Sequence, residues 1–152
     1  MLRVSLGLVS GLLLIQSAPA REPGFHTELI GSTVSEVSGR ASAQLDLSEM
    51  GALVMRCGGE EVRIPYNKVN TLEYGQNVNR RYVAAVLVSP VFLLSKSRKH
   101  FITVGYTDSE EKQQALVFRV DKGDVRPLLA SLEARTGRRV EYQDNEARKS
   151  GE

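Results

Sequence analysis

The sequence predicts a mainly β, α+β domain: an antiparallel barrel or strongly bent sheet that is capped by one C-terminal amphipathic helix. Two observations support this prediction. Between residues 51 and 120, short segments of alternating apolar and polar residues are separated by Gly-rich or polar turns, which is typical of antiparallel strands. Residues 124–136 then change to the helical spacing of apolar residues. We expect one domain over residues 43–142.

Residues 1–20 have the pattern of a secretory signal peptide. Arg3 precedes a continuous apolar block, and Ala18 and Ala20 place small residues at the −3 and −1 positions of a cut after Ala20. The block, residues 4–15, is shorter than the ~20 residues of a spanning helix, which favours cleavage over a transmembrane anchor. We therefore expect an exported protein, either periplasmic or extracellular.

The mature chain, residues 21–152, is almost electrically balanced. The full sequence has 20 Lys and Arg against 18 Asp and Glu, a formal net charge of +2. Cleavage removes Arg3 as the only charged residue, which leaves 19 − 18 = +1. A dedicated nucleic-acid binder would be strongly basic overall. We expect no nucleic-acid partner.

Both ends of the mature chain are predicted to lie outside the packed domain. Residues 21–42 are rich in Ser, Gly and Thr and hold few large apolar residues, which predicts a flexible N-terminal arm. Within this arm, residues 28–30 are the ones suited to pair loosely with the domain. The polar residues 143–152 predict a disordered tail.

The first strands form a predicted hairpin. Residues 51–57 (GALVMRC) and 60–66 (EEVRIPY) each alternate apolar and polar positions. Gly58 and Gly59 between them supply a tight turn, because glycine reaches positive φ without steric cost. Pro65 donates no ladder hydrogen bond, so it belongs at an edge or a strand end.

Further strands are predicted over residues 68–76, 100–107 and 114–120, with 108–112 as a polar hairpin loop. A short strand or extension is expected at 138–142.

The helix has signals at both ends. Asp124 is the predicted N-cap, Pro127 falls in the first turn, and Gly137 is the predicted C′ residue. The apolar stripe consists of Val125, Leu128, Leu129, Leu132 and Thr136.

Residues 51–74 (GALVMRCGGEEVRIPYNKVNTLEY) resemble the front half of PH-like and GRAM-like domains, in which two strands and an I-P-Y-x-x-V step lead into a third strand. Residues 124–137 (DVRPLLASLEARTG) are similar to the helix that plugs one end of such barrels. The resemblance extends over residues 43–137 and implies a PH-like barrel. Some members of the family bind lipid headgroups, but no lipid-site motif matches here, so the resemblance assigns no binding residue.

The apolar segment 82–95 is a departure from that family pattern. It is too short to span a bilayer, and Ser89-Pro90 interrupts it. Three interpretations remain: a buried strand or strand-plus-turn covered on both faces, a loop that dips into a membrane surface, or a patch for a protein partner or a second copy. Cations flank the segment on both sides, an arrangement suited to anionic headgroups, because each nearby cation contributes ~1 kcal/mol to binding at an anionic membrane surface. The candidate membrane or partner contacts are Arg80, Arg81, Val91, Phe92, Leu93, Lys96, Arg98 and Lys99.

The sequence assembles no catalytic or metal-binding constellation. Cys57, the single cysteine, continues an apolar strand face and is interpreted as a small buried hydrophobe, with a reactive or intermolecular thiol as the alternative. His26 lies in the predicted arm and His100 begins a strand, and no local motif supports a Cys57–His100 dyad. Motifs of the G-x-S-x-G, H-E-x-x-H and C-x-x-C kinds do not occur. We expect neither enzymatic activity nor a cofactor nor a metal.

Two functions follow from these expectations. The first is a non-catalytic exported interaction module of the cell envelope that binds a protein or peptide partner. The alternative is a peripheral module that inserts residues 83–94 into a membrane surface while the flanking cations contact phosphates. A small enzyme that uses Cys57 is a weaker third hypothesis. The sequence specifies no oligomeric state.

Overall fold

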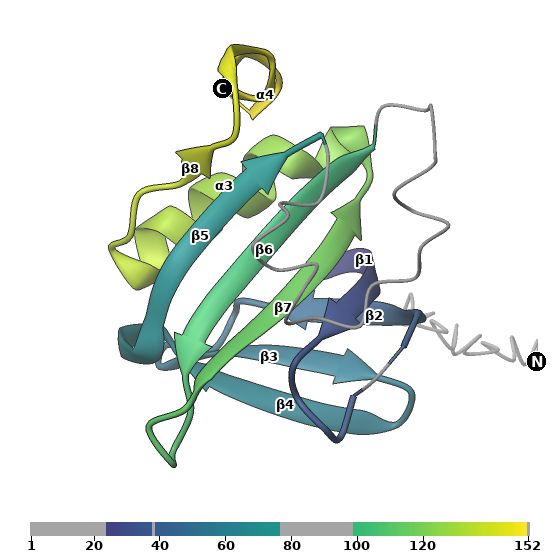
Figure 1. Ribbon diagram of the computed structural model, residues 1–152, viewed down its shortest axis with the longest axis vertical. Coiled ribbons are helices and arrows are strands. Elements are labelled where there is room, and N and C mark those ends of the chain that lie inside the picture. The colour runs from purple at the N-terminus through teal and green to yellow at the C-terminus, as the bar shows by residue number, and fades with distance from the viewer. Residues whose placement is uncertain (1–23, 38, 77–98, 152) are drawn as a thin grey trace, which may run out of the picture.

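The computed structural model describes residues 24–37, 39–76 and 99–151, which form an open eight-stranded sheet with two helices (Figure 1). The strands are β1 (Phe25–Ser32), β2 (Ala41–Asp46), β3 (Ala52–Cys57), β4 (Glu60–Pro65), β5 (Val69–Gly75), β6 (His100–Thr107), β7 (Gln113–Val120) and β8 (Glu141–Tyr142). A 3-10 turn, η1 (Tyr66–Lys68), separates β4 from β5, and the helices are α3 (Lys122–Thr136) and α4 (Asn145–Gly151).

The strand order is β4-β3-β2-β1-β7-β6-β5-β8. Every neighbouring pair is antiparallel except β5–β8, which is parallel. The mainly β prediction and the C-terminal helix are confirmed, but the closed barrel is wrong. Pro65 and η1 carry the chain away from β4, and β5 then pairs with β6 and β8, which leaves β4 at an open edge.

β1 joins the two halves of the sheet. Thr27 pairs with Ala43 of β2 on one side and with Val120 of β7 on the other. The register to β7 shifts between Leu29 and Gly31, and such a bulge bends a strand. In Figure 1 the β2–β4 half accordingly runs in a different direction from β5–β7.

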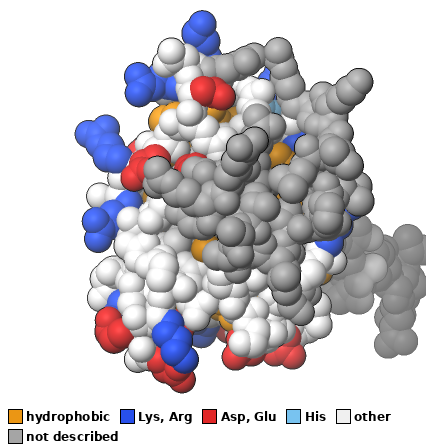
Figure 2. All heavy atoms as spheres, in the orientation of Figure 1, with side chains coloured by type: hydrophobic (Ala, Val, Ile, Leu, Met, Phe, Trp, Pro, Cys, Tyr) orange, Lys and Arg blue, Asp and Glu red, His pale blue; other side chains and the backbone are white. Residues whose placement is uncertain are grey.

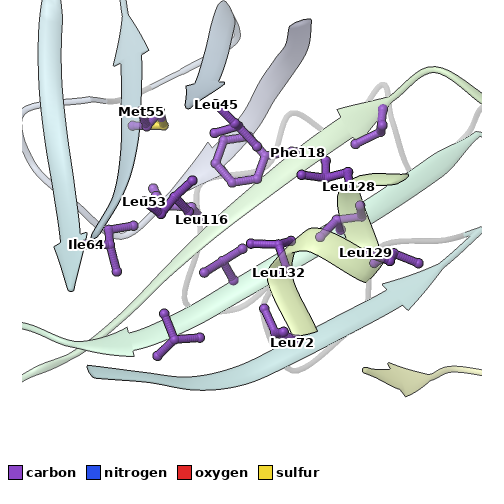
Figure 3. Close-up of a cluster of buried hydrophobic side chains, with 14 of the residues drawn as sticks. Leu45, Leu53, Met55, Ile64, Leu72, Leu116, Phe118, Leu128, Leu129 and Leu132 are labelled. Carbon is purple, nitrogen blue, oxygen red and sulfur yellow. The ribbon is translucent and has the colours of Figure 1, made fainter. Parts of the chain in front are cut away.

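One apolar core fills the space between the two halves and α3 (Figure 3). Alternation along each strand places one set of side chains on this inner face. Its largest fully buried members are Leu29, Leu45, Leu53, Met55, Ile64, Leu72, Tyr74, Ile102, Leu116, Phe118 and Leu128.

Helix α3 begins two residues earlier than predicted. Its N-cap is Asp121 rather than Asp124, so Pro127 lies in the second turn and not in the first. The C-terminal prediction is confirmed, since Gly137 is left-handed (φ 69°) and donates its N–H to the Glu133 carbonyl at 2.9 Å. The predicted apolar stripe is buried at Val125, Leu128, Leu129 and Leu132.

The flexible-arm prediction for residues 21–42 is wrong over residues 25–32 and 41–42, although the expected pairing of residues 28–30 with the domain does occur. Residues 25–32 form the central strand β1, and β2 begins at Ala41. Leu29 and Ile30 are almost fully buried, because strands on both sides of β1 supply the apolar surroundings that its own composition does not suggest.

The disordered-tail prediction for residues 143–152 is wrong over residues 145–151. These residues form α4, whose Ala147 is fully buried. Asp144 supports its start, because its carboxylate accepts the Ala147 N–H at 2.7 Å. The remaining strand predictions match within one or two residues, apart from 138–142, of which only Glu141–Tyr142 is a strand. The predictions for residues 1–20 and 82–95 lie outside the described residues.

Candidate functional site

Of the eight predicted contact residues, the structure describes Lys99 alone. The other seven, which lie outside the described residues, are Arg80, Arg81, Val91, Phe92, Leu93, Lys96 and Arg98. Lys99 is half-buried and directly precedes β6. Gly75 of β5 pairs with Phe101 of β6, so the chain leaves and re-enters the described part at the same end of the sheet.

A group of three cations lies near this end, and we call it the basic group: Lys122 and Arg126 of α3 and Lys149 of α4. Together with Gly123 and Ser150 they line a hollow of about 570 Å³. Lys122 and Arg126 are four residues apart, so they occupy one face of the helix. Within the described ranges, none of the three cations makes an ion pair. Their mutual repulsion favours the binding of an anion.

Two further hollows continue from the basic group along the sheet. The first, of about 430 Å³, is lined by Lys99, His100, Arg119, Val120, Asp121 and Lys122. The second, of about 470 Å³, is lined by His26, Thr27, Glu28, Arg40, Ala41, Ser42, Arg119 and Asp121. Shared lining residues make the three hollows adjoin. Figure 2 shows Lys and Arg side chains, with a few acidic ones among them, along the upper left border of the molecule near α4 and the C-terminal part of α3, and further acidic side chains at the lower end.

The positive charge along these hollows is uneven. Glu28, whose side chain is 16% exposed, pairs with Arg119 at 2.5 Å and also with Arg40. Glu28 offsets one of these two positive charges, and Asp121 lines both of the hollows that contain Arg119, whereas no carboxylate lines the hollow of the basic group.

A Tyr–His pair holds β5 and β6 together beside these hollows. The Tyr74 hydroxyl lies 2.6 Å from Nδ1 of His100, and the two rings are stacked with centroids 6.1 Å apart. Tyr142 of β8 packs edge-on against Tyr74. Burial lowers the pKa of His100, and nearby Lys122 lowers it further, while burial raises the pKa of Tyr74. Both groups are therefore uncharged at neutral pH.

The lowered pKa of His100 predicts a loss of stability in weak acid. The unfolded chain takes up this proton near the ordinary pKa of 6.5, before the folded chain does. The free energy of unfolding should therefore fall as the pH falls from 6.5 towards the folded-state pKa, and then level off. Urea unfolding at several pH values between about 5 and 8 measures this slope, in a range above the carboxylate pKa values.

His100→Gln should remove that slope, whereas the control His26→Gln, which changes an exposed residue of β1, should retain it. An unchanged slope in His100→Gln would assign the pH dependence to another group.

The described residues do not assemble the thiol–imidazole pair. Cys57 is buried, as predicted, and burial raises the pKa of its thiol, so it stays protonated at neutral pH. It lies opposite Ala43 and Glu60 at one end of β3, whereas His100 contacts Tyr74. In the same part of the chain, no group of three or more His, Cys, Asp or Glu side chains is placed to hold a metal ion.

The basic group is not predictable from the sequence, because the polar residues around Lys149 predict a disordered tail. The spacing of Lys122 and Arg126 was the one available signal. Over the residues that the structure describes, no helix has the length and apolarity to cross a membrane. No protein-family model matches the chain, and no curated protein matches its sequence.

Proposed function

We propose that this chain is a non-catalytic, exported interaction module of the cell envelope with a PH-like fold. The element order supports the PH-like assignment: two antiparallel runs, β2–β4 and β5–β7, are followed by a helix whose apolar stripe packs into the core between them. Export rests on the signal-peptide pattern of residues 1–20.

The partner that the geometry favours is an anionic membrane surface, and the basic group is the observation that carries this proposal. Lys122, Arg126 and Lys149 converge on one hollow that no carboxylate lines. A cation near an anionic bilayer contributes ~1 kcal/mol, so the three together supply about 3 kcal/mol.

The sequence also indicates that the end of the sheet near the basic group, where β5 ends and β6 begins, faces the membrane. The segment that joins β5 to β6 contains the apolar run 82–95 and cations on both of its flanks. Electrostatic attraction by the basic group and insertion of apolar side chains would then act on the same surface.

Co-sedimentation with vesicles tests this proposal. Residues 21–152, which contain every described element, are mixed with phosphatidylcholine vesicles with and without phosphatidylglycerol. Lys122→Glu/Arg126→Glu should weaken binding to the anionic vesicles about thirtyfold, the equivalent of ~2 kcal/mol for two lost cations. Added salt should weaken binding of the unmodified chain.

The matched control is Arg135→Glu/Arg139→Glu, which makes the same charge change at the other end of α3: Arg135 lies about 20 Å from Lys122 along the helix, and Arg139 follows the helix end. It should reduce binding much less. Equal losses in both pairs would mean that net charge alone matters, and recovery of the unmodified chain in the supernatant with either vesicle would remove the membrane proposal. Leu93→Asp tests the apolar contribution separately, because it leaves the basic group intact.

A protein or peptide partner is the second candidate. The open edge of β4 favours it, because an exposed edge offers main-chain hydrogen bonds to an added strand.

A further inference from the structure

The outer side of β4 is an unpaired sheet edge. Figure 1 shows β4 at the border of the sheet, and among the described residues its only ladder partner is β3. Native sheets usually obstruct such edges, so the groups that β4 presents decide what can bind there.

The register of the β3–β4 hairpin shows which main-chain groups face outward. Gly58 and Gly59, both with positive φ, form a two-residue turn, so the flanking pair Cys57–Glu60 is hydrogen-bonded. Hydrogen-bonded pairs alternate with non-hydrogen-bonded pairs along the hairpin, counted from Cys57–Glu60. The hydrogen bond from the Tyr66 N–H to the Gly51 carbonyl (3.1 Å) falls at a position where this alternation requires one.

The intervening residues of β4, which are Glu61, Arg63 and Pro65, therefore direct their N–H and C=O groups away from β3. Pro65 has no N–H. The open edge thus has two donors, at Glu61 and Arg63, and an added strand forms complete hydrogen-bonded pairs opposite these two residues only.

We propose that the occupant of this edge is the β4 strand of a second copy, paired antiparallel about a two-fold axis through Val62. Glu61 of each copy then lies opposite Arg63 of the other copy. Each such pair exchanges two N–H···O bonds, so all four outward donors of the two edges are satisfied. This proposal is independent of the membrane proposal, because it uses another edge of the molecule.

Charge selects this register. Residues that lie opposite one another in an antiparallel pair place their side chains on the same face, so the glutamate of one copy meets the arginine of the other. Shifting the strands by two residues in either direction puts Glu61 against Glu61 or Arg63 against Arg63, which like charge disfavours.

The side chains needed for this pairing are accessible. Glu61 and Arg63 are 41% and 54% exposed, and they already contact each other at 3.0 Å. Arg56 and Glu49 extend the same row of alternating charges within one copy. A two-fold contact continues that row of charges across both copies. Because the contact occupies the β4 edge of each copy, no β4 edge remains to add a third, and the assembly closes as a dimer.

Analytical ultracentrifugation of residues 21–152, without lipid and up to millimolar concentration, tests the proposal. We expect a weak, concentration-dependent dimer, because the interface is small. Glu61→Arg and Arg63→Glu should each raise the dimer Kd at least tenfold, since each places like charges opposite one another. The double change Glu61→Arg/Arg63→Glu should restore dimerisation, because opposite charges face each other again.

Two further variants keep the test decisive. Glu111→Arg, a charge reversal in the β6–β7 loop, should leave the dimer Kd unchanged. Val62→Cys in a Cys57→Ser background should form a disulfide-linked dimer under mild oxidation, since the two Val62 positions face each other across the axis. A chain that stays monomeric at every concentration overturns the proposal, as does a dimer that neither single reversal weakens.

Discussion

Replacing Phe118 with alanine is expected to lower the free energy of unfolding by about 3–5 kcal/mol. Phe118 is fully buried on β7, where it pairs in register with Leu29 of β1 and Ile102 of β6. Figure 3 shows its ring between Leu45 of the β2–β4 half and Leu128 of α3. Its removal leaves a cavity where both halves of the sheet and the helix meet, so no single element can move in to fill it.

Urea unfolding followed by far-ultraviolet circular dichroism measures this change, since the chain has no tryptophan to report by fluorescence. Because domains of this size have a total stability of only about 5–15 kcal/mol, Phe118→Ala is expected to lose a large share of it and to unfold at a clearly lower urea concentration. Met50→Ala, at a position that is 91% exposed, is the control and should change stability by less than about 0.5 kcal/mol. A loss below about 1 kcal/mol in Phe118→Ala would mean that the two halves do not share one core.

The second large effect is expected at Tyr74, with the hydroxyl and the ring contributing separately. Tyr74→Ala should lower the free energy of unfolding by about 3–5 kcal/mol, because the ring is fully buried and contacts both His100 and Tyr142. Tyr74→Phe keeps the ring and removes only the hydroxyl beside His100, so we expect a loss of about 1 kcal/mol.

The same unfolding measurement, carried out at pH 8, separates the two terms while His100 is neutral in both states. Similar losses in Tyr74→Ala and Tyr74→Phe would mean that the hydroxyl contact, rather than ring packing, holds β5 to β6.

The elements that were predicted from the sequence are those that carry their own local signals. The β3–β4 hairpin has Gly58-Gly59 at its turn and alternation on both sides, and α3 has helical apolar spacing that ends at Gly137. Each of these signals acts within a few residues, so a single sequence is sufficient to read it.

The missed elements depend on distant residues. β1 is central because β2 and β7 flank it, and nothing within residues 25–32 reveals those neighbours. α4 is a short helix whose buried Ala147 depends on packing against other elements. Isolated helices of this length are unstable in water, so the local sequence does not predict α4.

The basic group was not predicted, for the same reason. The flanking cations around 82–95 are adjacent in the sequence, and Lys99 is the one that the structure describes. Lys99 and the other seven contact residues all remain predictions. Lys149 lines the same hollow as Lys122 because β8 and α4 bring the end of the chain back beside the start of α3. The spacing of these residues in the sequence does not predict that approach.

The central position of β1 has a consequence for the timing of folding. Thr27 must pair with Val120, at the end of β7, before the two halves can be united. Contacts with such large sequence separation form slowly, and these cannot form before β7 has been synthesised. An N-terminal deletion that reached into residues 25–32 would leave the two halves unable to assemble.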